Sequence, residues 1–316
     1  MKFTNKFNVP SEIIRAYHND KYSKGDSDFS ITGLITPPQQ RVLKEMYRPE
    51  ITIDYSDEIW KLLGSGIHAV IERANENYTD NLTEQRFTVD ILGKKVSGQI
   101  DNLNVPEKKL EDWKVTSSYT VKNAIKNGIK SEWVSQLNCY KYLYEKSTGK
   151  KIDQLNIICL CRDWNRWEFE RSGSPYPECP IATLPVEIWE TEKTEKFLTD
   201  RVALHKETDI AVEMGIRVMP VCTDEERWMK PDEFRVTKKG RKSAMRRLPS
   251  EEEANEWIKK NVPEKIHKDI SIVFIKGEAT RCKAYCPVSN FCSQYQEEVK
   301  NSEGGEQWTK NSKDAT

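Results

Sequence analysis

Three neighbouring segments with β-strand patterning limit the folds open to this chain. Residues 87–101 alternate apolar and polar side chains around Gly93, a pattern that predicts a β-hairpin. Residues 110–115 have the composition of a third strand, and residues 131–147 carry a helical pattern that stops at Gly149. The stretch therefore predicts a core in which strands pack with at least one helix.

The segments on either side extend this α/β pattern. Residues 57–78 place apolar side chains close to a 3.6-residue period and predict a helix, whereas residues 30–38 have β character up to a Pro-Pro break. Further elements are expected later in the chain, in the order strand 153–164, strand 182–189, helix 190–215 and helix 251–261.

The 316 residues are enough for one large domain or two modest ones, and the character of the sequence changes beyond Pro220. We expect an N-terminal segment, a core, an extension with a basic hairpin and cysteines packed on the core, and a disordered polar tail. Their predicted ranges are 1–50, 51–215, 216–300 and 301–316.

Composition excludes some classes of protein. Lys+Arg and Asp+Glu number 50 each, so the formal net charge is zero and any nucleic-acid footprint has to be local. The chain has no apolar run of about eighteen residues, so we expect no membrane span, and residues 1–10 lack the apolar core of a signal peptide. The expected location is the cytoplasm, where the eight cysteines are thiols or metal ligands rather than disulfides.

Two carboxylates and a lysine occupy the predicted strands. Asp101 ends the hairpin and Asp112 lies in the next strand, where opposed side chains are about 5 Å apart and can share a hard cation. Lys114 projects from the same face as Asp112 and can stabilise negative charge on a substrate. This set predicts a metal-dependent nuclease, because phosphodiester cleavage needs a water activated beside a cation. The alternative is a surface ion pair, since a lone Asp-x-Lys is common.

Three further side chains are candidates for the same site. His68 follows Gly64-Ser-Gly66 on a predicted helix, and neutral imidazole is a good ligand for a divalent ion. Gln136 and Tyr140 are four residues apart on a helix and share a face, from which they can border the carboxylates and steady Lys114 or a DNA backbone. The alternatives are a hydrogen-bonded core histidine and ordinary helix packing.

These motifs occur in a defined order along the chain. The order is Gly64-Ser-Gly-Ile-His68, Gly98-Gln-Ile-Asp101, Asp112-Trp-Lys114 and Gln136-x-x-x-Tyr140. The set resembles the RecB-like branch of the PD-(D/E)XK nuclease superfamily, and the wider chain looks like the phage-encoded exonucleases of that group. The motifs span residues 64–140, which is under a third of the chain.

The resemblance implies a restriction-endonuclease-like core, with a mixed central β-sheet flanked by helices, followed here by a C-terminal cysteine-bearing extension. It implies Mg²⁺ or Mn²⁺ bound by His68, Asp101, Asp112 and the backbone carbonyl of Trp113, with Lys114 as the catalytic lysine. The implied activity is hydrolysis of DNA phosphodiester bonds by an exonuclease of phage-type recombination, replication or repair, in the host cytoplasm. A single-strand annealing protein or a helicase is an expected partner besides DNA.

The C-terminal part carries a compact cysteine motif. Cys282, Cys286 and Cys292 lie within eleven residues and can meet at one metal ion or cluster, which needs a fourth ligand. Cys222, in a loop-like context, is the best fourth candidate, and Cys179 is the reserve.

Several RecB-like nucleases carry a [4Fe-4S] cluster on C-terminal cysteines. The resemblance therefore makes such a cluster the expectation here, with zinc and no metal as alternatives. In those relatives the first ligand precedes the motif histidine, whereas this chain has no cysteine before Cys139.

Six cations within ten residues mark a candidate DNA contact. They are predicted to lie on a hairpin with Gly240 in its turn, and they are Lys238, Lys239, Arg241, Lys242, Arg246 and Arg247. Such a hairpin suits contacts to phosphates, which set affinity and position rather than sequence. A solvated basic hairpin without a partner is the alternative.

Two other classes of protein compete with a nuclease. A non-catalytic DNA-binding or assembly subunit can retain the same fold, but such relatives usually lose a ligand, and the Asp, Asp, Lys and His set is complete in this chain. A structural protein stabilised by zinc on its cysteines is the other class, and metal analysis separates it from a nuclease.

Overall fold

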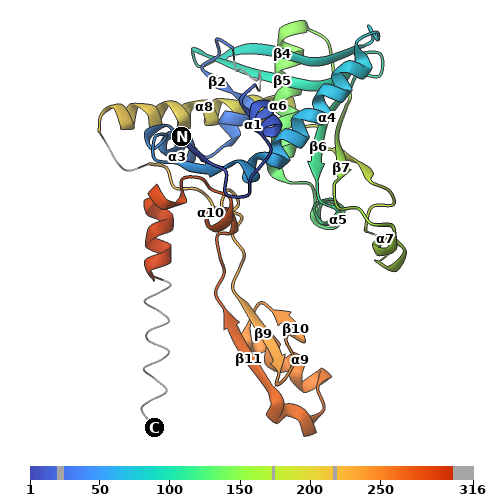
Figure 1. The fold of residues 1–316 in the computed structure, drawn as a ribbon, viewed down its shortest axis with the longest axis vertical. Coiled ribbons are helices and arrows are strands. Elements are labelled where there is room, and N and C mark those ends of the chain that lie inside the picture. Colours follow the sequence, from blue (N-terminus) through green and yellow to red (C-terminus); the bar gives the residue numbers. More distant parts are fainter. Residues whose placement is uncertain (20–24, 173–174, 216–218, 302–316) are drawn as a thin grey trace. The chain divides into compact units, whose positions relative to one another are not determined.

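The computed structural model describes residues 1–19, 25–172, 175–215 and 219–301. Contacts divide the chain into two compact units, each of which contains β-sheet of its own (Figure 1). The first unit consists of Met1–Val42 with Arg48–Met219, and the second of Leu43–Tyr47 with the residues from Pro220 onward.

A mixed six-stranded sheet forms the centre of the first unit. The strand order is β2–β5–β6–β7–β8, with β4 paired along β5. The β2–β5 and β6–β7 pairs are parallel and the other pairs are antiparallel. The strands are β2 (Phe29–Ser30), β4 (Asn81–Ile91), β5 (Lys94–Asn104), β6 (Lys109–Thr116), β7 (Gln154–Cys161) and β8 (Ile181–Val186). The prediction of an α/β fold with a mixed central sheet is confirmed.

Strands β4 and β5 form the predicted hairpin. Leu92 and Gly93 make its turn with φ angles of 53° and 71°, in the left-handed region that tight hairpin turns require. The side chain of Asp90 accepts a hydrogen bond from the N–H of Gly93, 3.0 Å long. The turn fixes the register of the hairpin and therefore decides which side chains of the two strands face each other.

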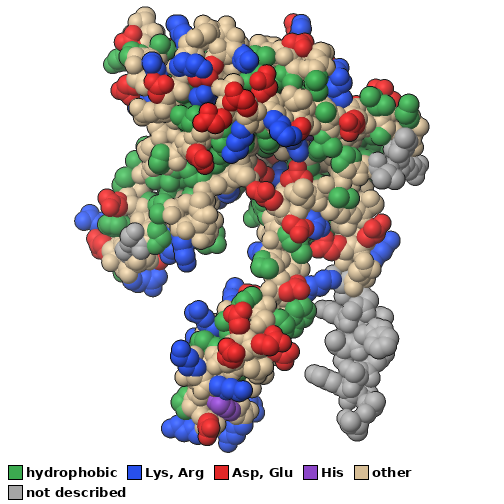
Figure 2. Space-filling model, turned by 180° about the vertical axis from the view of Figure 1, so that it is seen from behind, with side chains coloured by type: hydrophobic (Ala, Val, Ile, Leu, Met, Phe, Trp, Pro, Cys, Tyr) green, Lys and Arg blue, Asp and Glu red, His purple; other side chains and the backbone are tan. Residues whose placement is uncertain are grey.

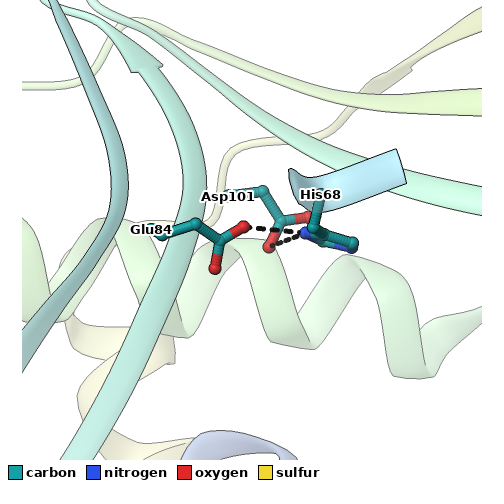
Figure 3. A group of neighbouring side chains, drawn as sticks. All are labelled: His68, Glu84 and Asp101. Atoms are coloured by element: carbon teal, nitrogen blue, oxygen red, sulfur yellow. Dashed lines mark hydrogen bonds and ion pairs between the residues drawn. The ribbon is translucent and has the colours of Figure 1, made fainter. Parts of the chain in front are cut away.

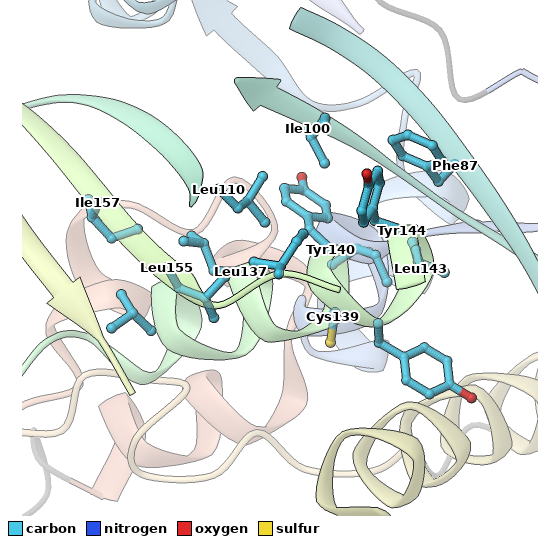
Figure 4. Close-up of a cluster of buried hydrophobic side chains, with 14 of the residues drawn as sticks. Phe87, Ile100, Leu110, Leu137, Cys139, Tyr140, Leu143, Tyr144, Leu155 and Ile157 are labelled. Atoms are coloured by element: carbon cyan, nitrogen blue, oxygen red, sulfur yellow. The ribbon is translucent and has the colours of Figure 1, made fainter. Parts of the chain in front are cut away.

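Helix α6 (Ser131–Thr148) supplies much of the buried core (Figure 4). It ends before Gly149, as predicted, and the φ of 71° at this glycine is typical of a helix C-terminus. Gly98 of β5 meets the helix at close range, because a Cβ atom there would lie 2.7 Å from the ring of Tyr140. The sheet therefore approaches α6 this closely only with glycine at the position.

The parallel strands β6 and β7 are connected through α5 (Ser118–Asn127) and α6. Parallel neighbours need a crossover of this kind, and it brings the carboxyl ends of both strands to the same edge of the sheet. At that edge the N–H of Arg162 donates to the carbonyl of Thr116 over 2.9 Å. The side chains that follow β6 and β7 are thus neighbours in space.

Residues 31–35 form a helix, α2 (Ile31–Ile35), and only Phe29–Ser30 pair as a strand. The prediction of β character for residues 30–38 is therefore wrong beyond Ser30. The Pro-Pro sequence begins helix α3 (Pro38–Met46) instead of ending a strand, since proline is well tolerated in the first turn of a helix.

Helix α8 (Thr191–Glu213) is joined to α2 and α3 by a buried histidine. The Nε of Arg41 donates to Nδ1 of His205 over 2.9 Å, and Nε2 of His205 lies 3.1 Å from the carbonyl of Leu34. Arg201 donates to the same carbonyl over 2.6 Å. These bonds fix the long helix to the start of the chain.

The N-terminal residues join the first unit through a short parallel pair. Strand β1 (Lys2–Thr4) lies beside β3 (Thr52–Asp54), with α1 (Ser11–His18) between them in sequence and η1 (Tyr55–Glu58) after β3. The carboxylate of Asp54 accepts hydrogen bonds from Thr4 and from the backbone of Lys6. The first residues are thus held against the segment that leads into α4 (Ile59–Asn75).

The second unit contains a three-stranded sheet in the order β10–β9–β11, with helix α9 (Glu251–Asn261) packed on it. Its strands are β9 (Glu233–Lys238), β10 (Arg246–Leu248) and β11 (Ile270–Ile275). Strands β9 and β10 form the predicted basic hairpin, and Gly240 between them has a φ of 81°. The predicted tail, from residue 302 onward, lies outside the described residues.

The described part of the chain also contains short helices, which are α7 (Arg166–Ser172), η2 (Glu264–Asp269), α10 (Thr280–Ala284) and η3 (Ser289–Phe291), and residues 293–301 are helical as well. Among the described helices, none combines the length and the apolar character that a membrane crossing requires. Figure 2 shows cationic and anionic side chains interspersed over much of one face, in keeping with the formal net charge of zero.

Candidate metal centre

Three side chains of types that can ligate a metal ion, each from a different element, meet at one point of the first unit. His68 comes from α4, Glu84 from β4 and Asp101 from β5 (Figure 3). Nδ1 of His68 lies 2.9 Å from a carboxylate oxygen of Glu84 and 3.7 Å from one of Asp101. One ligand atom from each residue lies within 4.8 Å of the others, and no other such group of three is found in the described part of the chain.

Glu84 reaches this point through a distortion of β4. Its φ of 52° is left-handed, and the pairing with β5 passes from Thr83 to Gln85 without it. A left-handed non-glycine residue within a strand is strained. The side chain is held in place by Gln99, whose Nε2 donates to Oε2 of Glu84 over 2.6 Å.

The sequence motifs did not predict Glu84 as a site residue. A signal was nevertheless present, because the tight turn at Leu92–Gly93 sets a register in which Glu84 faces Asp101 across the hairpin. A carboxylate opposite another carboxylate in a buried sheet is unfavourable without a cation.

Asp112 and Lys114 lie beside this group on β6. Their side chains are in contact, with Nζ of Lys114 against Oδ2 of Asp112, as expected for residues two apart on one face. The N–H of Trp113 donates to Oδ2 of Asp101 over 2.8 Å, which ties β6 to the first carboxylate. Asp112 is only 1% exposed, so its charge is balanced by these neighbours rather than by water.

The electrostatics of the group reflect an excess of buried carboxylates. Burial, and after it the neighbouring Asp112, raise the pKa of Asp101 to about 7. Burial lowers the pKa of Lys114, but the carboxylates of Asp112 and Asp101 raise it by more, so it lies above its ordinary value. The hydrogen bond with Glu84 raises the pKa of His68. Protons thus offset negative charge that a bound cation would otherwise neutralise.

The Gln-Tyr pair of α6 lies against the second carboxylate. Nε2 of Gln136 is 3.2 Å from Oδ1 of Asp112 and 2.9 Å from the hydroxyl of Tyr140. Tyr140 is 6% exposed and packs against Gly98. The structure therefore brings all four sequence motifs to one place, and Gln136 orients Asp112 while Tyr140 orients Gln136.

The group opens into a cavity of about 810 Å³. Its walls come from α4 and the β4–β5 hairpin, and they include the cationic side chains of Lys61 and Arg86. Arg86 donates to Oε1 of Gln99 over 2.7 Å, and Gln99 in turn binds Glu84. A ligand in the cavity would meet the candidate metal ligands and two cations together.

Four thiols gather in the second unit. Burial raises the pKa of Cys222 to about 12, and Glu226 together with the thiols of Cys292, Cys282 and Cys286 adds to the shift. The side-chain amide of Gln294 accepts a hydrogen bond from the N–H of Cys222 and donates one to its carbonyl, each 2.9 Å long. The candidate fourth ligand is thus fixed beside the compact motif, although about sixty residues separate them in the sequence.

The other cysteines lie in the first unit. Cys139, Cys159 and Cys161 are buried among apolar side chains, whereas Cys179 is exposed and its Sγ lies 3.1 Å from the carbonyl of Ile181. Among the described residues, no three sulfur atoms of the chain lie within 4.8 Å of one another.

The predicted cationic residues lie on the β9–β10 hairpin of the second unit. Glu233 pairs with Arg235 and also lies 4.0 Å from Arg247. Within the described ranges, no ion pair engages the other five predicted residues, which are Lys238, Lys239, Arg241, Lys242 and Arg246.

No family model and no curated protein matches the sequence. Among solved structures the chain is similar to SSO0001, with a TM-score of 0.43 and 13% identity over 68% of this chain and 100% of that one. It is also similar to a protein from Eubacterium rectale that is provisionally described as an exonuclease, with a TM-score of 0.29 and 17% identity over 65% of this chain and 74% of that one. At these TM-scores neither similarity bears on the chemistry of the site.

Proposed function

We propose that the chain is a metal-dependent deoxyribonuclease that hydrolyses DNA phosphodiester bonds, most simply as an exonuclease. The observation that carries the proposal is the convergence of His68, Glu84 and Asp101 beside the contact between Asp112 and Lys114. A site of this kind combines hard oxygen ligands with a fixed ammonium group, and phosphodiester hydrolysis requires both.

The residues present fit Mg²⁺ or Mn²⁺. Three carboxylates and one imidazole gather here, and burial together with the neighbouring Asp112 raises the pKa of Asp101, so a cation at this point would be favoured. His68, Glu84 and Asp101 would hold the ion, with Asp112 and the carbonyl of Trp113 as the further ligands that the resemblance implies. A bound divalent cation would lower the pKa of a water and neutralise charge on the phosphate.

The protein's own groups have distinct tasks in this proposal. Lys114 presents a cationic amine, kept charged by Asp112 and Asp101, to the negative charge that develops on the phosphate oxygens. Gln136 fixes the orientation of Asp112 through its hydrogen bond to Oδ1. The strained Glu84 is preorganised by Gln99 and so pays its conformational cost before substrate binds.

The proposal is tested by incubating the purified protein with Mg²⁺ or Mn²⁺ and end-labelled linear, circular and single-stranded DNA. Linear DNA should be degraded from its ends, and Lys114→Ala should lower the rate about a hundredfold or more, the usual loss on removing one charge-stabilising group. Lys150→Ala, at an exposed position, is the matched control. Undiminished cleavage by a folded Lys114→Ala variant would contradict the assignment, and absence of any metal-dependent cleavage by the wild type would favour the DNA-binding subunit.

We also propose that the four thiols of the second unit bind a [4Fe-4S] cluster. The support is the gathering of the four thiols, since Cys282, Cys286 and Cys292 are close enough to Cys222 to raise its pKa, together with the resemblance of the C-terminal motif to nucleases that carry such a cluster. Zinc on the same thiols is the alternative that metal analysis separates. The cluster would connect the Cys222 segment to the compact motif and so stabilise the second unit.

Iron and sulfide analysis of anaerobically purified protein tests this second proposal. Cys222→Ser should lose iron together with visible absorbance, whereas Cys179→Ser, the exposed control in the first unit, should retain both. Zinc in place of iron, or full iron content in Cys222→Ser, would overturn the proposed ligand set.

A further inference from the structure

Helix α4 carries an exposed aromatic side chain, an open glycine and the candidate ligand His68 along one side. Trp60, Gly64 and His68 follow one another at intervals of four residues, which places them in a row on the helix surface. Trp60 is 55% exposed, an unusual degree for so large an apolar side chain. The helix rises about 12 Å between Trp60 and His68.

Arg162 covers the indole of Trp60 from a different part of the fold. Its guanidinium carbon lies 4.5 Å from the ring centroid. Arg162 follows β7, and its backbone is bonded to Thr116 at the end of β6. Lys114 lies only two residues before Thr116, about 7 Å along the strand. The aromatic–cation pair therefore sits at the sheet edge next to the catalytic candidates.

Gly64, between the indole and His68, is not required by packing of this chain. A Cβ atom built there meets none of the described atoms within 4 Å, and the residue is in a right-handed helix where alanine is the more favourable choice. The glycine thus leaves a bare strip of helix surface, over which another backbone can pass closely.

We propose that an unpaired stretch of the substrate strand runs along α4, with one base stacked at Trp60 and Arg162, the sugar–phosphate backbone crossing Gly64, and the scissile phosphate at the metal centre. The inference rests on the proposed nuclease function and adds the residues that position the strand. Aromatic faces stack on any base, and a guanidinium beside them supplies permanent positive charge for the backbone.

A second aromatic–cation pair provides a control within the same chain. Trp167 is 63% exposed, with the guanidinium carbon of Arg171 at 4.6 Å from its ring. Both residues lie on α7, four positions apart, so this pair forms by local helix geometry alone. It tests whether removal of any exposed tryptophan has the effect predicted for Trp60.

The stacking is tested with single-stranded oligonucleotides and two substitutions of Trp60. Trp60→Ala should lower kcat/KM about tenfold to a hundredfold, Trp60→Phe should keep most of it, and Trp167→Ala should leave it unchanged. Substrates that carry one abasic nucleotide at successive positions test the same contact. At one position only, the missing base should lower kcat/KM of the wild type by the same factor as Trp60→Ala, and it should not lower kcat/KM of Trp60→Ala any further. Equal losses for both proteins at every abasic position would overturn the inference.

The path over the helix is tested with two glycines of the same helix. Gly64→Ala and Gly66→Ala should both raise the melting temperature, because alanine favours the helix and neither Cβ meets described atoms within 4 Å. Only Gly64→Ala should also raise KM, because Gly66 lies on a different side of α4. Full activity in Gly64→Ala would overturn the path.

Binding without cleavage separates this inference from the proposed function. In a Lys114→Ala background, Trp60→Ala should weaken binding of a fluorescently labelled oligonucleotide about tenfold or more in fluorescence anisotropy. Unchanged binding would overturn the strand path even if the protein is a nuclease. If Trp60→Ala weakens binding but the wild-type protein does not cleave DNA, the strand path is upheld and the catalytic proposal is refuted.

Discussion

At the scale of single residues, Glu84 is the site residue that depends most on the fold. Its left-handed φ and its hydrogen bond from Gln99 hold a carboxylate against His68 and Asp101. Strain of this kind persists only where the surrounding structure fixes it, and it is concentrated at functional sites. Glu84 therefore offers a sharper test of the metal centre than the motif residues themselves.

We predict that Glu84→Gln binds Mn²⁺ at least about tenfold more weakly than the wild type, as measured by calorimetry. The amide retains the size of the side chain and can still bond to His68, so the loss comes from the missing negative charge. Glu72→Gln is the matched control, because Glu72 lines the same cavity outside the three-ligand group. Equal affinity in all three proteins would remove Glu84 from the site.

His205 couples stability to pH. Burial, and after it the charge of Arg41, lower its pKa to about 4 from the ordinary value of 6.5. The folded protein therefore binds this proton less readily than the unfolded chain, so the contribution of His205 to the free energy of unfolding falls as the pH drops from about 6.5 towards 4, by up to about 3 kcal/mol. The raised pKa of Asp101 acts in the opposite direction, because the folded protein binds that proton more readily than the unfolded chain.

Urea unfolding at pH 7 and pH 5 measures this effect. The free energy of unfolding of His205→Gln minus that of the wild type should be larger at pH 5 than at pH 7, because the variant lacks the buried imidazole that opposes folding at the lower pH. The exposed His18 is the control site, and the stability of His18→Gln should change with pH as that of the wild type does. A His205→Gln variant with an unaltered pH dependence would assign the effect to other groups.

At the scale of elements, the hairpin, β6 and α6 were predictable because their patterns and their turn chemistry agree. The glycine of the tight turn and the alternating side chains predicted the hairpin, and Gly149 predicted the end of the helix; the structure contains each of these. Helix α2 was not predictable in this way, because its five residues are too few to show a helical period of apolar side chains. The proline pair after it is also compatible both with the end of one element and with the start of a helix. Glu84 was missed because a motif search does not track cross-strand register.

The contact between β5 and α6 gives a prediction at this scale. In Gly98→Ala the added methyl would lie 2.7 Å from the ring of Tyr140 and 2.9 Å from Leu143, so the helix or the ring has to shift. Overpacking of this kind typically costs about 1–3 kcal/mol, and displacement of Tyr140 also frees Gln136 from its position at Asp112.

Chemical denaturation and cleavage assays on Gly98→Ala should thus show loss of both stability and rate. Tyr140→Phe keeps the ring but removes the hydroxyl that accepts from Gln136, and it should lower the rate with a smaller loss of stability. A Gly98→Ala protein with the denaturation midpoint of the wild type would show that the close approach is not a constraint.

At the scale of the whole molecule, the candidate metal-binding motifs fall into separate units. The carboxylate centre belongs to the first unit and the four thiols to the second. The sequence located both sets, since clustered motifs are visible at short range. Cys222 was named from the sequence as the best fourth candidate, and hydrogen bonds between its backbone and the side chain of Gln294 fix it beside the other three thiols, a contact 72 residues apart that no local pattern encodes.

The most direct measurement of the central claim is an anomalous difference map from crystals grown with Mn²⁺. A metal-dependent nuclease centre predicts a strong peak bonded to His68, Glu84 and Asp101, in protein that degrades linear DNA when the crystals are dissolved. A map with no peak among these three side chains, from protein that cleaves DNA with Mn²⁺, would show that the ion and the chemistry lie elsewhere.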